Sequence, residues 1–214
     1  MLWAITALVV LSGCESNDAD KATVPAGYSA SPAATPASQQ VPWPAPPNPL
    51  ELAKAAGLTP DVRESFTYHV HAHLDLFVNG KRVPLPGGLG IDTTDPEVKR
   101  SEVLGQPAFG GIKMCSKPCI SPLHTHDVTG LLHVEAPQRQ PFTLGQFFTH
   151  WDVPLTESCI GGYCRTATSI VVFVDGKRHG GDPSAIELID RKEIAILIGS
   201  PPKEVPSTYD FSNA

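Results

Sequence analysis

One segment of the chain restricts the possible folds more than any other. Residues 67–79 (TYHVHAHLDLFVN) alternate strictly between polar and apolar side chains, and the apolar set is Val70, Ala72, Leu74, Leu76 and Val78. A period of two is typical of a β-strand with one buried face. The Asn79-Gly80 pair that follows is strongly favoured in two-residue hairpin turns, so a second strand is expected at residues 81–85. The sequence therefore predicts a β-hairpin near the start of the folded region.

The remaining elements predict an α+β fold. Apolar strands are expected at residues 130–136, 169–174 and 193–198, the second of them central, with another hairpin turn at Asp175-Gly176 and a short helix at 50–58. A second helix should begin at Thr143, since Thr143 and Gln146 have the spacing of a capping box. Its core-facing stripe would be Leu144, Phe147, Phe148 and Trp151. We predict a mainly antiparallel sheet with one packed helix, and residues 131–198 resemble β-grasp domains in their order of elements.

The N-terminal residues resemble a bacterial export signal. Residues 2–11 (LWAITALVVL) form an apolar run that is too short to span a bilayer, which takes about 20 residues, but suits a secretory signal. Leu11-Ser12-Gly13-Cys14 then resembles the lipobox of bacterial lipoproteins, although no Lys or Arg precedes the run. The resemblance implies that residues 1–13 are removed and that Cys14 carries the lipid, including palmitate, that anchors the chain to a membrane. Glu15 in place of Asp implies the outer membrane, where the host has one.

Composition divides the rest of the chain. Residues 14–49 are rich in Ala, Pro and Ser, which predicts a flexible spacer because few apolar groups are available to offset the entropy of ordering. Residues 50–210 are expected to form a single His-rich domain, followed by a tail at 211–214. The formal net charge of −6 and the scattered Lys and Arg residues argue against nucleic acid as a partner. Nothing in the sequence identifies a protein partner.

The four cysteines beyond Cys14 are predicted to form two disulfides. An even number of cysteines in an exported domain favours this chemistry. Three pairings remain open, with local pairs favoured, and a four-thiolate zinc site is the alternative that oxidation outside the cytoplasm disfavours. The cysteines are Cys115, Cys119, Cys159 and Cys164.

Histidines are the candidate functional residues. Six of the eight lie in two short segments: His69, His71 and His73, and then His124, His126 and His133. If these segments pair, their imidazoles could converge on one ion at about 2.0–2.1 Å. We predict that these six contribute to one metal site, although an ion needs only three or four donors and not all six need bind at once. Asp75, Asp127 and Glu135 are predicted to orient ligands or to act as candidate bases. His124 and His126 would reach the site only if the loop after Pro122 folds over it. The alternative is a set of solvent-facing histidines. His150 and His179 are expected to have structural or solvent-facing roles.

The amino-acid sequences of three segments support a single site. HVHAHLDLFVNGKRV, PLHTHDVTGLLHVEAP and FTLGQFFTHW resemble a group of secreted or lipid-anchored bacterial and archaeal proteins, and the resemblance covers nearly the whole domain. It implies that the segments act together, without assigning an activity.

Imidazole-rich sites suit zinc, copper, nickel and iron, and intrinsic affinity favours copper. The prediction is therefore a lipid-anchored protein of the cell envelope, facing the periplasm or the exterior, that binds copper or zinc. Because ligand imidazoles must be neutral, binding should weaken below a pH of about 6.5. Two alternatives stay open, namely a metal-dependent envelope enzyme and a metal-free ligand-binding or envelope-binding module.

Overall fold

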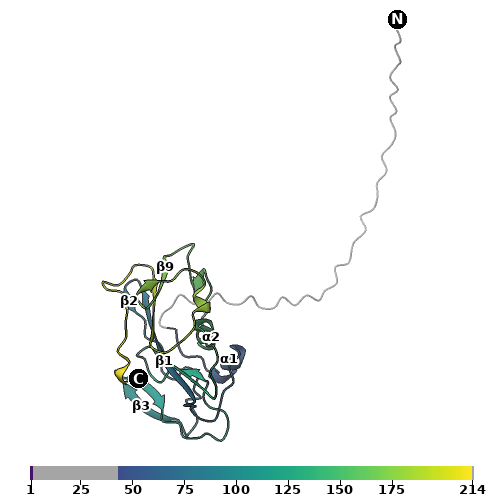
Figure 1. The fold of residues 1–214 in the computed structure, drawn as a ribbon, viewed down its shortest axis with the longest axis vertical. Coiled ribbons are helices and arrows are strands. Elements are labelled where there is room, and N and C mark those ends of the chain that lie inside the picture. Colours follow the sequence, from purple (N-terminus) through teal and green to yellow (C-terminus); the bar gives the residue numbers. More distant parts are fainter. Residues whose placement is uncertain (2–42, 214) are drawn as a thin grey trace, which may run out of the picture. The chain divides into compact units, whose positions relative to one another are not determined.

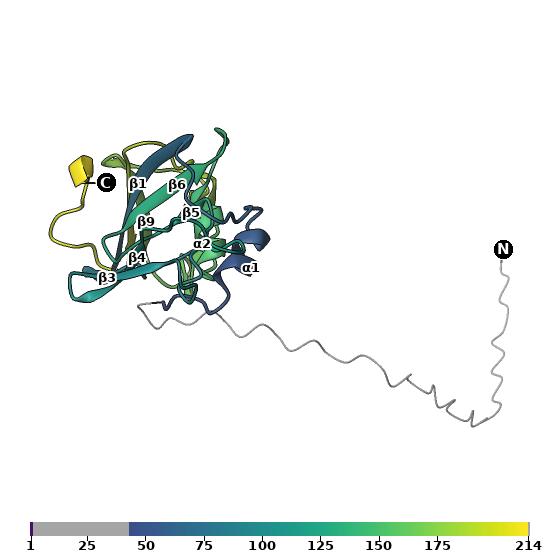
Figure 2. The same ribbon diagram turned by 90° about the horizontal axis from the view of Figure 1, so that it is seen from below.

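A computed structural model describes Met1 and residues 43–213, whose main feature is a seven-stranded mixed sheet (Figures 1 and 2). The strands follow the order β10-β9-β11-β1-β6-β5, and β2 pairs with the end of β1. Only β1 and β11 are parallel among these pairs, so the predicted α+β fold with a mainly antiparallel sheet is confirmed. The bounds are β1 Tyr68–Val78, β2 Lys81–Arg82, β5 Leu123–His124, β6 Leu131–Ala136, β9 Ile170–Val174, β10 Lys177–Arg178 and β11 Lys192–Ile198.

Both predicted hairpin turns are confirmed. Asn79 and Gly80 have φ values of 49° and 75°, and Asp175 and Gly176 have φ values of 49° and 73°. Two consecutive residues with positive φ are what a type I′ turn requires, and Asn-Gly and Asp-Gly are the pairs that adopt it at low cost. These turns join β1 to β2 and β9 to β10.

One helix packs in the core as predicted. Helix α2 (Leu144–His150) begins at Thr143, whose side chain and that of Gln146 form the capping box. Its apolar stripe is buried together with the inner face of the sheet, and α1 (Pro49–Ala55) packs against it. The core also contains Trp43, whose indole makes an edge contact with Trp151 at 5.7 Å between ring centroids. The folded region therefore begins before Leu50, inside the stretch assigned to the spacer.

The C-terminal half shares its sheet with the N-terminal half. In the predicted β-grasp-like block, β6 precedes α2, and β9, β10 and β11 follow it. Strand β1 lies between β6 and β11 and pairs with both, so these strands do not form a sheet of their own. Strand β9 was expected to be central, but it lies between β11 and the two-residue strand β10, with burial that alternates between buried and half-buried.

Several short elements have no clear signal in the sequence. Two small hairpins, β3 (Lys99–Val103) with β4 (Gln106–Gly110) and β7 (Cys159–Ile160) with β8 (Tyr163–Cys164), lie outside the main sheet. Strand β3 is almost wholly exposed and carries no apolar alternation, while β7 and β8 are too short to show a period. Two 3-10 turns, Pro183–Ala185 and Phe211–Asn213, complete the fold.

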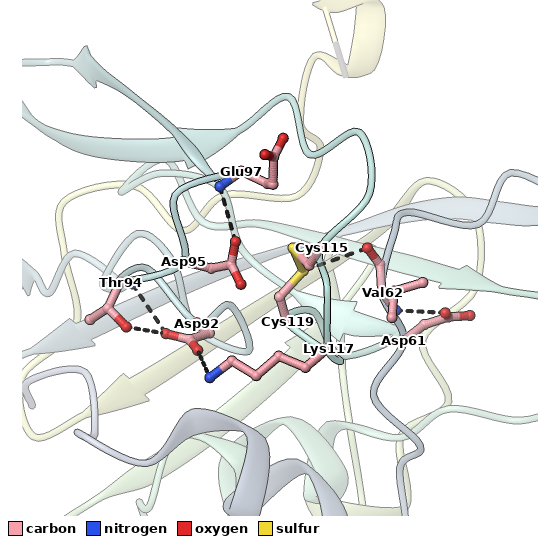
Figure 3. Close-up of a disulfide and its surroundings, with 9 residues drawn as sticks. All are labelled: Asp61, Val62, Asp92, Thr94, Asp95, Glu97, Cys115, Lys117 and Cys119. Atoms are coloured by element: carbon pink, nitrogen blue, oxygen red, sulfur yellow. Dashed lines mark hydrogen bonds and ion pairs between the residues drawn. A yellow bond between two sulfur atoms is a disulfide. The ribbon is translucent and has the colours of Figure 1, made fainter.

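Both disulfides form between near neighbours, Cys115 with Cys119 and Cys159 with Cys164, which confirms the local pairing. Figure 3 shows the first of them beside Val62, whose carbonyl lies 3.7 Å from the sulfur of Cys119. This disulfide belongs to a small second core with Ile91, Val98, Ile112 and Ile120. Disulfides are typical of proteins outside the cytoplasm. Within the described part of the chain, no helix has the length and apolar character needed to cross a membrane.

Candidate metal centre

Three neighbouring strands each contribute one histidine to a single row. In the antiparallel register His71 of β1 lies opposite His133 of β6, which in turn lies opposite His124 of β5. Directly opposed residues project from the same face of a sheet with their Cβ atoms about 4.5–5.5 Å apart. In the adjacent row of β1 and β6, His69 lies opposite Glu135. Since these side chains share one face, their polar ends meet above it.

The first donor group consists of His69, His71 and His133. The Nε2 atom of His71 lies 3.0 Å from His69 Nε2 and 3.1 Å from His133 Nδ1. The Oε1 atom of Glu135 completes the ring of contacts, at 3.3 Å from His69 Nε2 and 3.5 Å from His133 Nδ1. With bonds of 2.0–2.1 Å, two ligands of one ion lie about 2.9 Å apart at a right angle and about 3.3 Å apart at the tetrahedral angle. Each of these four distances is in the range expected of two neighbouring ligands of one ion.

The second donor group consists of His124 and His126, whose Nε2 atoms lie 3.3 Å apart. His124 Nδ1 donates to the Ser121 carbonyl at 2.9 Å, and His126 Nδ1 donates to the Phe109 carbonyl at 2.6 Å. A carbonyl can only accept, so each Nδ1 carries the proton and each Nε2 keeps its lone pair. This is how histidine ligands of metals are usually oriented in proteins.

Close packing places the His126 ring against β4. A Cβ atom at Gly110 would lie 3.0 Å from His126 Nδ1, closer than nearly all real contacts of this kind. Glycine at this position therefore lets the strand approach the ring and present the Phe109 carbonyl to it.

Burial keeps three of these imidazoles neutral. Desolvation, followed by the neighbouring histidines, lowers the pKa of His71 to about 4 and that of His133 to about 3. The fully buried His124 also has a pKa well below the usual value, chiefly through desolvation. Desolvation raises the pKa of Glu135, and nearby His69 and His126 oppose this effect. At neutral pH the centre thus offers unprotonated nitrogens, the form that binds a metal ion.

One carboxylate of the centre has no signal in the sequence. Glu64 Oε1 lies 3.9 Å from His126 Nε2, and the Glu64 side chain is largely buried. Burial and the charge of Glu135 raise its pKa. Glu64 belongs to no regular element, and only its tertiary position brings it to the histidines. A pocket next to the centre is lined by Glu64, His124 and Glu135, together with Pro60 and Arg63.

His73 lies in a different cluster from the other five predicted ligands. It is opposite Glu193 of β11, and its Nδ1 lies 2.8 Å from Glu193 Oε2. Its Nε2 lies 3.0 Å from the Thr129 carbonyl, and its ring stacks on Tyr209 with centroids 3.8 Å apart. Asp75 belongs to this cluster as well, where it accepts a 2.7 Å hydrogen bond from Arg82.

His73 therefore lies apart from the other five predicted ligands, in a separate group of possible donors with Asp75 and Glu193. Alternation places it on the same face of β1 as His71, but two residues further along the strand the neighbours are β11 and the loop before β6. Its ring nitrogens are both engaged there, whereas His69, His71, His124, His126 and His133 converge.

The other predicted residues have separate places. Asp127 accepts hydrogen bonds from the backbone and hydroxyl of Thr129, so it stabilises a turn. His150, expected to be structural or solvent-facing, is fully buried, and neither ring nitrogen has a partner among the described residues. His179 follows β10, away from both donor groups. The proposed lipid site, Cys14, lies outside the described residues.

Comparison with known proteins adds no family to these observations. The chain matches no model of a protein family, no curated protein and no solved structure.

Proposed function

We propose that this protein binds a transition metal, with copper favoured over zinc, on the outer side of a bacterial membrane to which lipid on Cys14 attaches it. The observation that carries the proposal is the convergence of five imidazoles and Glu135 from β1, β5, β6 and the segment after β5. Solvent-facing histidines would point apart and stay hydrated. Here His124 and Glu135 are buried, and ring nitrogens face each other at 3.0–3.3 Å.

The donor set supports a transition metal over calcium or magnesium, and copper and zinc are the favoured candidates. Neutral imidazoles with a carboxylate suit both metals, and copper binds such donors more tightly. Thiolates do not contribute, because all four described cysteines are in disulfides. Calcium and magnesium are disfavoured because they bind oxygen ligands.

Metal content tests this proposal. Protein purified without a His tag from copper- and zinc-replete cells should contain bound metal by elemental analysis. His71→Ala and His126→Ala each remove one imidazole of the centre and should lose much of it. His179→Ala is the matched control, since it removes a histidine that belongs to neither donor group. The proposal fails if the wild-type protein binds neither Cu(II) nor Zn(II) more tightly than a protein with ordinary surface histidines.

The lipid anchor has a separate test. The Leu-Ser-Gly-Cys sequence at residues 11–14 is its motivation. Cells fed an alkyne fatty acid should label the wild-type protein and not Cys14→Ala, which should leave the membrane fraction. Equal labelling of the two proteins would exclude lipid attachment at this cysteine.

A metal-dependent enzyme is a second candidate because the pocket reaches the centre. His124 and Glu135 both line it, so a small molecule could approach a metal held there. A catalytic ion keeps a coordination position open for water or substrate, whereas a storage or carrier site is closed. Addition of azide to the copper-loaded protein separates the two. A new ligand-to-metal absorption band would favour the enzyme, and an unchanged spectrum would favour the carrier.

A further inference from the structure

We infer that the centre is dinuclear, with one ion at the first donor group, a second ion at the second donor group, and Glu135 bridging them. This inference rests on the proposed function and specifies how many ions the site takes and which residues hold each. Glu64 is assigned as a ligand of the second ion. The argument depends on the number of donors, their grouping and the position of the Glu135 carboxylate.

The centre holds more donors than one ion uses. A four-coordinate copper or zinc ion takes three or four protein ligands, whereas five imidazoles and two carboxylates meet here. The potential ligands fall into two overlapping sets, His69-His71-His133 and His124-His126-His133-Glu135, each with its donor atoms within 4.8 Å of one another. His133 lies between the halves, with its ring centroid 4.5 Å from that of His71 and 4.3 Å from that of His126.

The Glu135 carboxylate lies between the two donor groups, where it would bridge two ions. Its Oε1 atom is 3.3 Å from His69 Nε2 in the first donor group and 3.8 Å from His124 Nε2 in the second. Its Oε2 atom is buried and has no hydrogen-bond partner among the described residues. A buried carboxylate oxygen without a partner is costly unless a cation or a donor satisfies it. Because Oε1 lies beside both donor groups, this oxygen is the one that would bridge two ions at the separation of two-metal sites, about 3.5–4 Å.

Charge and access support the same arrangement. Neutral imidazoles do not offset the charge of two divalent ions, and Glu64 and Glu135 are the carboxylates in contact with the histidines. Both line the pocket beside His124, so the second ion would lie on the side from which a small molecule enters. Glu64 Oε1, at 3.9 Å from His126 Nε2, lies within the range of two ligands on one ion at a wide angle.

Metal stoichiometry tests the inference. The full-length mature protein, stripped with a chelator and reloaded with Zn(II) or Cu(II), should bind two ions per chain. His71→Asn should retain the second ion and His126→Asn the first, so each variant should bind one. His179→Asn is the control and should bind two. Circular dichroism and thermal unfolding establish that each variant is folded.

Electron paramagnetic resonance of the Cu(II)-loaded protein provides an independent readout. Two bridged Cu(II) ions couple, so the integrated signal of the wild type should fall well below two spins per chain. His71→Asn and His126→Asn should each give one uncoupled spin. Glu135→Gln should weaken the coupling, and Glu64→Gln should weaken binding of the second ion alone.

The outcomes separate this inference from the proposed function. One ion per wild-type chain with one full spin would overturn the dinuclear centre and leave metal binding intact. No bound metal would overturn both. Loss of both ions in either single variant, or retention of both, would contradict the division of ligands between the two donor groups.

Discussion

At the scale of single residues, the partner of each imidazole decides its role. His124 and His126 give their Nδ1 protons to backbone carbonyls and so present free Nε2 atoms to one another. His73 instead lies against the carboxyl group of Glu193 and the Thr129 carbonyl. The predicted histidine ligands thus divide between two clusters, according to what surrounds each ring.

His73→Ala should therefore lower stability without lowering metal content. The change would leave the buried Glu193 carboxyl without its partner, and breaking a buried pair in this way costs about 3–5 kcal/mol. Chemical denaturation and elemental analysis of the same preparation measure the two effects. Addition of Glu193→Gln to this variant removes the unpaired acid and should recover part of the loss. A folded His73→Ala protein that lacks an ion would place His73 among the ligands after all.

At the scale of elements, the Cys115–Cys119 loop connects one disulfide to the candidate metal centre. Backbone hydrogen bonds join Cys115 to Val62 at 2.7 Å and Cys119 to Asp61 at 2.8 Å, and Asp61 in turn donates to Ile120. Figure 3 shows Asp61 and Val62 beside this disulfide. Glu64 lies two residues beyond Val62, and β5 with His124 begins shortly after Ile120. The loop therefore holds both segments that supply the second donor group and Glu64.

Removal of this disulfide should weaken metal binding more than removal of the other. Loss of the groups that orient metal ligands typically costs 10–100-fold in affinity, so a drop of roughly that size is expected for Cys115→Ser/Cys119→Ser. Cys159→Ser/Cys164→Ser is the matched control, because β7 and β8 supply no residue of the centre and this change should affect stability alone. Competition titration with a metal chelator measures both. Equal affinities in the two variants would show that the Cys115–Cys119 loop does not position the ligands.

At the scale of the whole molecule, buried histidines make the metal-free protein sensitive to acid. Burial lowers the pKa of His150 to about 4, whereas an unfolded histidine titrates near 6.5. Between these values the unfolded chain binds a proton that the folded chain does not, so stability falls as the pH falls from 6.5 towards 4. The lowered pKa values of His71, His124 and His133 act in the same direction, while the raised pKa values of Glu135 and Glu193 oppose it.

His150→Leu should reduce this acid sensitivity. At about 1.4 kcal/mol per pKa unit, His150 accounts for roughly 3 kcal/mol of the stability lost between neutral pH and pH 4. Urea unfolding in the presence of a chelator, at pH 7 and at pH 4, gives the difference for wild type and variant. His179→Leu, which removes a histidine outside the core cluster, should keep the wild-type difference. If His150→Leu loses as much stability in acid as the wild type, then His150 does not account for this share of the acid sensitivity.

Local patterns in the sequence were enough to predict most of the fold. Alternation at residues 67–79, two turns with positive φ and the capping box at Thr143 each depend on neighbours within a few residues. Such short-range rules hold because backbone sterics and side-chain periodicity act before any tertiary contact forms. The exposed hairpin β3–β4 escaped prediction because its strands have no apolar alternation. The parallel pairing of β1 with β11 joins residues more than a hundred positions apart, which no local pattern records.

The candidate site was also predictable in part from the sequence and in part only from the tertiary structure. The sequence by itself determined which residues carry metal-binding chemistry and that His69, His71 and His73 share one strand face, since alternation requires it. Tertiary structure alone decided the partners: the register of β1, β6 and β5 aligns His71, His133 and His124, whereas β11 places Glu193 against His73. It also brought Glu64 to His126 through the backbone contacts of the disulfide loop. Strand register and loop packing depend on the whole core, so side-chain type could name most of the candidate ligands, although not Glu64, and could not give their grouping.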